Sequence, residues 1–175
     1  INSANSINIS RIFAQVCYYF EAFAQLDPSQ RQNAVFAVPS GNFGNLTAGL
    51  IAKVLGLPIK RFIAATNSND TVPRFLQDGR WQPHATQATL SNAMDVSNPN
   101  NWPRIQHLLD QGLIDAAELS AVARAHEAFL EGRRGPEAEF RELRGVERVA
   151  AVVARPVVDE AEQGLGLAEL LQAPG

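Results

Sequence analysis

Two short, largely apolar runs separated by a turn rich in glycine and asparagine constrain the fold of this chain more than any other feature. Residues 34–38 read AVFAV and residues 61–66 read RFIAAT, and both are bounded by turn residues, as is typical of strands buried in a parallel sheet. The turn between them, residues 39–45 (PSGNFGN), leads into an apolar run over 46–55 that ends at Gly56, which predicts a helix. The order strand, turn, helix, strand predicts a right-handed βαβ unit and an α/β fold.

Further elements are predicted from apolar periodicity and from residues that begin or end helices. Helices are expected over residues 8–26, from Asp70 or Thr71 to Gln77, from Trp102 through Leu109, over 116–130 and over 160–171. A further strand is expected over 149–153, whereas residues 79–101 are polar and show no helical period.

The amino-acid composition of the chain changes near residue 104. Every Asn and both Lys precede Arg104, and Ser120 is the only Ser or Thr that follows it. Beyond that point Ala, Glu, Arg, Leu and Val dominate. We therefore predict two regions, an α/β region over residues 1–104 and a mostly helical tail over 105–175.

Composition excludes several classes of function. The net charge of -3 and a pI near 5.6 give no basic face for nucleic acid or anionic lipid, and no run approaches the roughly 20 apolar residues of a membrane span. The three His are not spaced as metal ligands, so no metal site is expected. A single Cys forbids an internal disulfide and favours a reducing, cytoplasmic location.

The turn Ser40 to Asn45 (SGNFGN) is the strongest candidate binding site. Amides in the first turn of a helix have no intrahelical partner, so a strand-to-helix junction can hold an anion. Gly41 and Gly44 permit close approach of the backbone, Asn42 and Asn45 are candidate side-chain donors, and Phe43 could pack beneath the turn. The alternative is that Gly and Asn merely reverse the chain direction. The turn matches neither a P-loop nor the dinucleotide-binding fingerprint.

Two further segments carry an excess of short polar side chains. Ser3, Asn5, Ser6 and Asn8 precede the first helix, where Ser6 or Asn8 alone would suffice as an N-cap. The loop 91–101 (SNAMDVSNPNN), which includes Asn92, has a similar excess. Both segments are therefore candidates for contact with a polar ligand as well as for local capping.

Four blocks together carry a family resemblance: SANSINISR, VPSGNFGN, RFIAATNSNDTVPRFLQDG and ATLSNAMDVSNPNNWPR. In this order and spacing, over about residues 2–104, the chain resembles the threonine synthase family. The resemblance implies a pyridoxal 5'-phosphate (PLP) enzyme of fold type II, which converts O-phospho-L-homoserine and water to L-threonine and phosphate. It further implies that the turn over Gly41, Asn42, Phe43, Gly44 and Asn45 holds the cofactor phosphate, and that Ser3, Asn5, Ser6, Asn8 and Asn92 lie on the substrate side.

The chain departs from the family at the lysine that holds the cofactor. That lysine stands in a Ser-Phe-Lys-Asp context, whereas the two lysines here, Lys53 and Lys60, lie in other contexts. Lys53 is also about 12 Å along a helix from its N-terminus, at about 1.5 Å per residue. We therefore expect no catalytic residue in this chain, no activity from the chain alone, and a preceding N-terminal part of the same polypeptide. The resemblance is expected to fade after Arg104.

Two other functions stay open at this point. A related PLP-dependent phospho-lyase would use the same phosphate-binding turn on another phosphorylated amino acid. A non-enzymatic βαβ module that binds phosphate would need the turn but no lysine. The product formed by a longer polypeptide distinguishes the three functions. A threonine synthase would form threonine, a phospho-lyase would form a keto acid, and a binding module would show no turnover.

Overall fold

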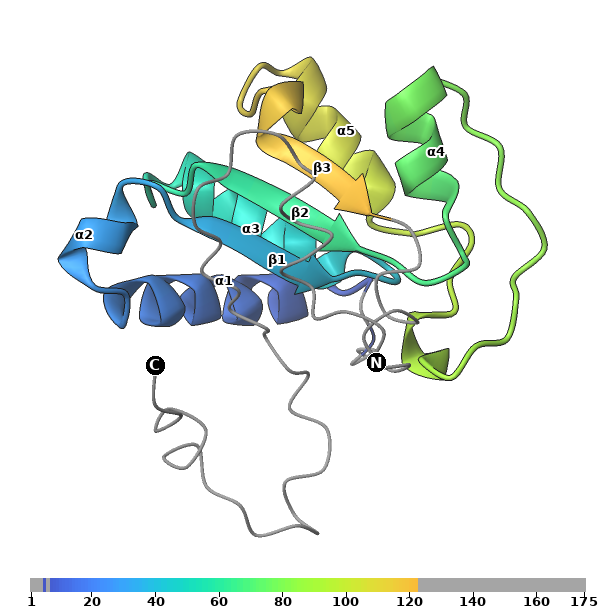
Figure 1. Cartoon of the computed structure of the whole chain (residues 1–175), viewed down its shortest axis with the longest axis horizontal. Helices are drawn as coiled ribbons and strands as arrows, with labels where there is room; N and C mark the ends of the chain where they lie inside the picture. The colour runs from blue at the N-terminus through green and yellow to red at the C-terminus, as the bar shows by residue number, and fades with distance from the viewer. Residues whose placement is uncertain (1–4, 6, 123–175) are drawn as a thin grey trace, which may run out of the picture.

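A three-stranded parallel sheet forms the centre of the computed structural model, which describes residue 5 and residues 7–122. The strands are β1 (Val35–Pro39), β2 (Arg61–Ala65) and β3 (Leu119–Val122), in the order β1-β2-β3 (Figure 1). Val35 pairs with Arg61, and Phe62 pairs with Leu119. The predicted α/β class and the parallel pairing of the first two strands are therefore confirmed.

Helices and short helical turns connect and cover the strands. Figure 1 shows α3 behind β1 and β2, with α1 running below it. The helical elements are α1 (Ile9–Ala24), α2 (Pro28–Arg31), α3 (Gly44–Val54), α4 (Thr71–Asp78), η1 (Asn92–Met94), α5 (Trp102–Asp110) and η2 (Ala116–Glu118).

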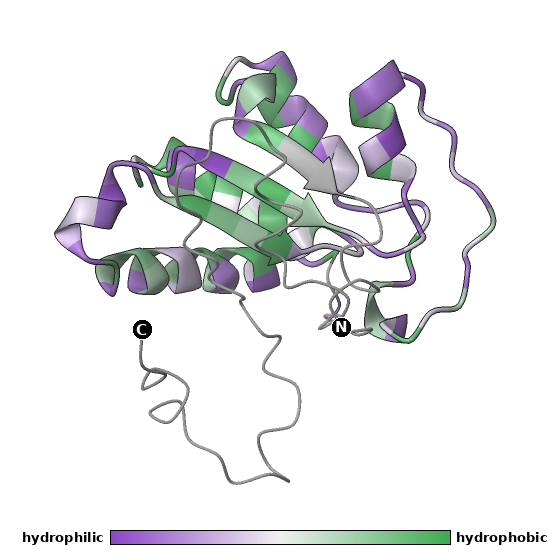
Figure 2. Ribbon diagram, in the orientation of Figure 1, coloured by the Kyte–Doolittle hydropathy of each residue, from purple (hydrophilic) through white to green (hydrophobic). Residues whose placement is uncertain are grey.

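Aromatic side chains hold α1 and α3 against the sheet. The ring of Tyr19 on α1 lies 5.6 Å from that of Phe36 on β1 and 5.9 Å from that of Phe62 on β2. On α3, a β-carbon added to Gly49 would lie 2.6 Å from Phe62 and 2.7 Å from Tyr19, so the absent side chain lets the layers approach. Figure 2 shows hydrophobic residues along β1 and β2, where this core lies.

A second aromatic cluster lies beyond β2. The rings of Trp81 and Trp102 stack at 5.7 Å with an interplanar angle of 16°, and Phe75 meets both edge-on at 5.5 and 5.6 Å. Phe43, in the turn between β1 and α3, meets Trp102 edge-on at 5.9 Å. The cluster thus fastens α4, the segment after it and α5 to that turn.

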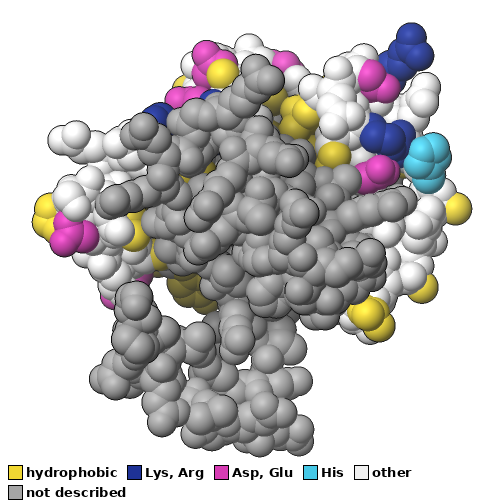
Figure 3. Space-filling view, in the orientation of Figure 1, with side chains coloured by type: hydrophobic (Ala, Val, Ile, Leu, Met, Phe, Trp, Pro, Cys, Tyr) yellow, Lys and Arg dark blue, Asp and Glu magenta, His cyan; other side chains and the backbone are white. Residues whose placement is uncertain are grey.

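Charges on the α4 side of the molecule are mixed in sign. In Figure 3, basic and acidic side chains and a histidine lie close together on that side of the visible face. Arg74 and Asp70 form an ion pair there, with 2.9 Å between Nε and Oδ1. Among the described residues, no helix is long and apolar enough to cross a membrane.

The elements differ from the predicted ones at one important place. The helix expected over 116–130 is wrong at Leu119–Val122, because these residues pair with β2 as the third strand, and sheet pairing overrides helical propensity. Residues 116–118 form the short turn η2. Residues 123–130 of that helix, the strand over 149–153 and the helix over 160–171 lie outside the described residues. The division into regions 1–104 and 105–175 stays a prediction, although α5 crosses residue 104 and β3 adds residues beyond it to the same sheet.

Candidate functional site

The turn between β1 and α3 leaves the sheet at its carboxyl edge. The Ser40 N–H donates to the Ala65 carbonyl oxygen at 2.8 Å, so the turn begins beside the end of β2. Phe43 then takes a left-handed conformation with φ of 60° as the N-cap of α3, which is uncommon for a residue other than glycine. Its side chain is 2% exposed, and its carbonyl oxygen accepts from Thr47 N–H at 2.9 Å and Thr47 Oγ1 at 2.7 Å. Burial therefore holds the turn in this shape, and Phe43 packs beneath it as predicted.

The polar side chains of the turn are engaged with the protein. Ser40 Oγ donates to Val38 O at 2.8 Å, Asn45 Nδ2 donates to Pro39 O at 2.6 Å, and Asn42 Oδ1 accepts from Asn100 N–H at 2.6 Å. The structure therefore differs from the expectation that the Asn45 amide donates to a ligand, because that amide braces the turn.

Two backbone donors at the end of the turn differ from these side chains. The N–H groups of Gly44 and Asn45 lie in the first turn of α3, where no carbonyl of the helix can reach them. Within the part of the chain that the structure describes, neither group has a hydrogen-bond acceptor. Their direction along the positive end of the helix dipole favours a negatively charged ligand. The donor set therefore fits a phosphate group, bound by backbone rather than by side chains.

The loop 91–101 packs directly on this turn. A β-carbon added to Gly41 would lie 2.7 Å from Met94 Cα and 3.1 Å from Met94 O, so the two backbones touch where Gly41 has no side chain. Asn101, which is fully buried, donates from Nδ2 to Asn42 O at 2.8 Å. The structure thus joins two segments that the sequence suggested separately.

Arg104 joins the N-terminal segment to the same place. Its guanidinium donates to Ile7 O at 2.7 Å and to Asn101 Oδ1. Sequence reasoning used Arg104 only as a boundary and missed this role. The spacing of Asn101 and Arg104, which brings the two onto one side of a helix start, is the one cue that could have found it.

The other predicted residues lie around this edge in different roles. Asn8 caps α1, with its Oδ1 accepting from Ser10 N–H at 2.9 Å, as predicted. Asn5 is exposed and accepts from Ile7 N–H at 3.2 Å, and Asn92 is exposed in η1, two residues before Met94. Ser3 and Ser6 lie outside the described residues.

A buried polar network at the end of β2 was also missed by sequence reasoning, which treated residues 67–70 as a simple loop. Asn67 is fully buried, and its Nδ2 lies within 2.8 Å of Asp95 Oδ1, 3.0 Å of Thr89 Oγ1 and 3.1 Å of Ser91 Oγ. Burial alone would raise the pKa of Asp95. The hydrogen bonds from Thr89 N–H, Thr89 Oγ1 and Asn67 outweigh it and lower that pKa below its usual value.

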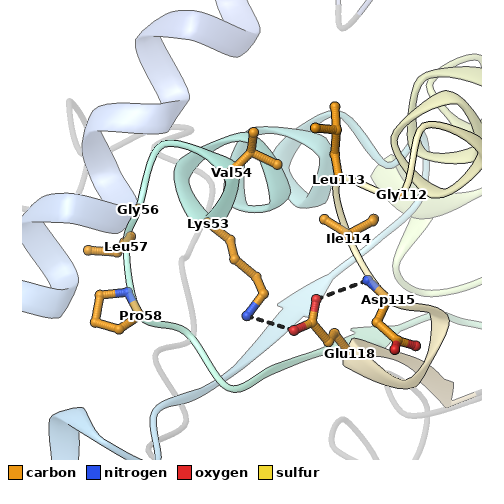
Figure 4. A pocket seen from close by; sticks show the side chains of 10 residues that line it. All are labelled: Lys53, Val54, Gly56, Leu57, Pro58, Gly112, Leu113, Ile114, Asp115 and Glu118. Carbon is orange, nitrogen blue, oxygen red and sulfur yellow. Dashed lines mark hydrogen bonds and ion pairs between the residues drawn. The ribbon is translucent and has the colours of Figure 1, made fainter.

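Both lysines lie at the opposite, amino edge of the sheet. Lys53 Nζ is 3.0 Å from Glu118 Oε1 and also donates to Ile59 O, just before β2. Figure 4 shows this pair beside a surface pocket lined by α3, the segment after it and residues 112–118. Lys60 donates to Asn33 Oδ1 at 3.1 Å, just before β1. Neither amine faces the turn at the carboxyl edge. The described residues also contain no group of three His, Cys, Asp or Glu side chains placed to hold a metal ion.

Curated proteins of known name match the chain closely. The threonine synthases of Serratia marcescens and Escherichia coli are each 58% identical to it over 165 residues, which is 94% of this chain and 38% of each relative. The threonine synthase of Haemophilus influenzae is 68% identical over 121 residues. No protein-family model matches. The chain thus spans 38% of the length of the first two relatives. A match of 165 residues extends past Arg104, whereas the matches of higher identity span only 121 and 108 residues, which agrees with a resemblance that weakens toward the tail.

Solved structures give the same result for the fold. The crystal structure of threonine synthase from Escherichia coli matches with a TM-score of 0.71 at 58% identity, over 82% of this chain and 36% of that one. A PLP-bound threonine synthase from Brucella melitensis matches with a TM-score of 0.58 at 33% identity, over 70% of this chain and 31% of that one.

Proposed function

This chain belongs to the threonine synthase family and spans part of the length of its relatives. We propose that its turn between β1 and α3 binds the phosphate group of PLP. In the longer protein, that cofactor serves the conversion of O-phospho-L-homoserine and water to L-threonine and phosphate. The observation that supports this proposal most directly is that the backbone N–H groups of Gly44 and Asn45, at the carboxyl edge of a parallel sheet, have no acceptor among the described residues.

The residues of this chain bind and orient, whereas the cofactor carries the chemistry. When bound, PLP supplies an electron sink for negative charge on substrate carbon atoms. Gly44 and Asn45 hold its phosphate, and Phe43, seated against Trp102, keeps those donors convergent. Because the burial of Phe43 and the hydrogen bond of Asn45 to Pro39 O already hold the turn in shape, we expect little of the binding free energy to be lost to ordering it.

The substrate is proposed to lie beside the same edge. Short polar side chains occur there on the N-terminal segment and on the loop 91–101, and Arg104 ties these two segments together. We assign the substrate side to Ser3, Asn5, Ser6, Asn8 and Asn92, whose amides and hydroxyls suit an amino acid with a phosphate ester.

Covalent attachment of the cofactor is assigned to a residue elsewhere in the longer protein. The positions of Lys53 and Lys60 at the amino edge support this assignment, and we expect no turnover from the 175-residue chain by itself. A cytoplasmic location suits Cys17, which is a free, exposed thiol.

Pyridoxine 5'-phosphate tests the phosphate site, because it lacks the aldehyde and cannot react with either lysine. Calorimetry is expected to show binding of this ligand to the 175-residue chain, competition by inorganic phosphate, and no binding of pyridoxine, which lacks the phosphate. Equal affinities for pyridoxine and pyridoxine 5'-phosphate would contradict the proposed role of the turn.

Product analysis tests the reaction. A longer polypeptide that includes this chain is expected to form L-threonine and free phosphate from O-phospho-L-homoserine. A keto acid as the main product from a phosphorylated amino acid would indicate a phospho-lyase instead. Binding of the phosphate ligand without turnover in any longer polypeptide would indicate a non-enzymatic module.

A further inference from the structure

The segment that follows α4 runs along one side of the molecule with little regular structure. Residues 82–88 are exposed and Leu90 is 85% exposed, so apolar burial does not hold this stretch in place. Figure 1 shows it as a long excursion from α4 to η1. Its position therefore depends on hydrogen bonds made by a few of its residues.

Asn69 holds the middle of this segment by pairing with its backbone. Asn69 Nδ2 donates to Gln87 O at 3.0 Å, and Gln87 N–H donates to Asn69 Oδ1 at 2.9 Å. This reciprocal pair resembles one rung of a strand ladder, although a side chain supplies one half of it. Asn69 is itself fixed by Asn67, whose Oδ1 accepts from both Asn69 N–H and Asn69 Nδ2 at 3.0 Å.

Asp95 holds the end of this segment that lies next to η1. Its Oδ2 accepts from Thr89 N–H at 3.0 Å, and its Oδ1 accepts from Thr89 Oγ1 at 2.7 Å and Asn67 Nδ2 at 2.8 Å. A carboxylate is the only side chain of this size that accepts all of these bonds, because it has two oxygens and no donor. Asp95 therefore connects the end of β2 to the residues just before η1.

Met94, the neighbour of Asp95, transmits this connection to the anion-binding turn. The backbone of Met94 lies against Gly41, and no side chain separates the two. Asn100 N–H and Asn101 Nδ2 donate to Asn42, the next residue of the turn, at 2.6 and 2.8 Å. Two parts of one loop therefore contact neighbouring residues of the turn.

We propose that Asp95 is a positioning residue, which through Asn67 and Thr89 seats Met94 on Gly41 and so sets the shape of the anion-binding turn. The inference rests on the proposed phosphate site, which Asp95 itself does not touch. The two possible effects of neutralising Asp95 change the affinity for phosphate in opposite directions. A negative charge near a bound phosphate is unfavourable, so charge alone predicts that neutralising Asp95 tightens binding, whereas loss of positioning predicts weaker binding.

Four variants of the 175-residue chain test this inference. Asp95→Asn removes one carboxylate oxygen from the network, and Thr89→Val removes a hydroxyl. Each is expected to weaken the binding of pyridoxine 5'-phosphate about tenfold, or about 1.4 kcal/mol. Thr89→Ser keeps the hydroxyl and is expected to rescue the affinity. Asp78→Asn is the charge control, because Asp78 is exposed and its Oδ1 accepts from Arg80 N–H.

Thermal unfolding of each variant gives the folded fraction, so that affinity is compared for folded protein only. Unchanged or tighter binding by folded Asp95→Asn overturns the inference and leaves the proposed function standing. If the unaltered chain binds no phosphate ligand, the proposed function fails, and amide exchange still tests the positioning. Asp95→Asn is then expected to speed exchange about tenfold at residues 41–44 as well as at 86–95. Faster exchange at 86–95 alone overturns the inference.

Discussion

Gly41 and Gly49 both lie where a β-carbon has no room, but a side chain there would disturb different parts of the molecule. At Gly41 the obstacle is the backbone of Met94, 2.7 Å away, and at Gly49 it is the buried rings of Phe62 and Tyr19. Gly41→Ala is therefore expected to weaken pyridoxine 5'-phosphate binding by about tenfold or more, because the turn and Met94 must separate. Gly49→Ala is expected to lower the free energy of unfolding by about 1–3 kcal/mol through overpacking, with affinity unchanged in the folded fraction. Calorimetric titration and chemical denaturation measure the two effects, and the pattern with the two roles exchanged would contradict the assignment.

Helix α1 is joined to the turn by one buried hydroxyl. Tyr19 OH donates to Asn45 O at 2.8 Å, and burial raises the pKa of Tyr19 well above its ordinary value of 10.0. Above about pH 10 the unfolded chain loses this proton while the folded chain keeps it, so the free energy of unfolding falls as pH rises. Tyr19→Phe is expected to cost about 0.5–1.5 kcal/mol at neutral pH and to remove this part of the alkaline loss. Denaturation of both proteins between about pH 8 and pH 11 measures it. Equal slopes for the two proteins in this range would show that Tyr19 is not shielded.

At the scale of the whole molecule, the two lysine side chains and the anion-binding turn lie on opposite edges of one sheet. Replacement of both lysines, Lys53→Arg with Lys60→Arg, is therefore expected to leave the affinity for pyridoxine 5'-phosphate within about twofold of the original. Arginine keeps the charge, so the ion pair with Glu118 is retained and stability should change little. The measurement is calorimetric titration of the double variant. A loss of affinity greater than about tenfold would place an amine in the site and overturn the assignment of covalent attachment to another residue.

Much of this fold could be predicted from local patterns in the sequence. β1, α3 and β2 follow from short apolar runs and a turn, because burial on both faces of a parallel strand leaves a signal within a few residues. β3 does not, since Leu119–Val122 becomes a strand only through pairing with β2, far away in sequence. The site divides in the same way. The turn was visible from its glycines, whereas Arg104 and Ile7 lie 97 residues apart and Asn67 and Asp95 lie 28 apart, and no local pattern reveals such contacts.

The stacked indoles of Trp81 and Trp102 give this chain an optical signature of its own. They are the two tryptophans of the sequence, and at 5.7 Å and 16° their transitions are close enough to couple. All indole circular dichroism and emission therefore arise from one cluster, whose edge is Phe43 of the anion-binding turn. The circular dichroism and the emission of these indoles are thus expected to report, without any added label, on whether α4 and α5 are packed against that turn.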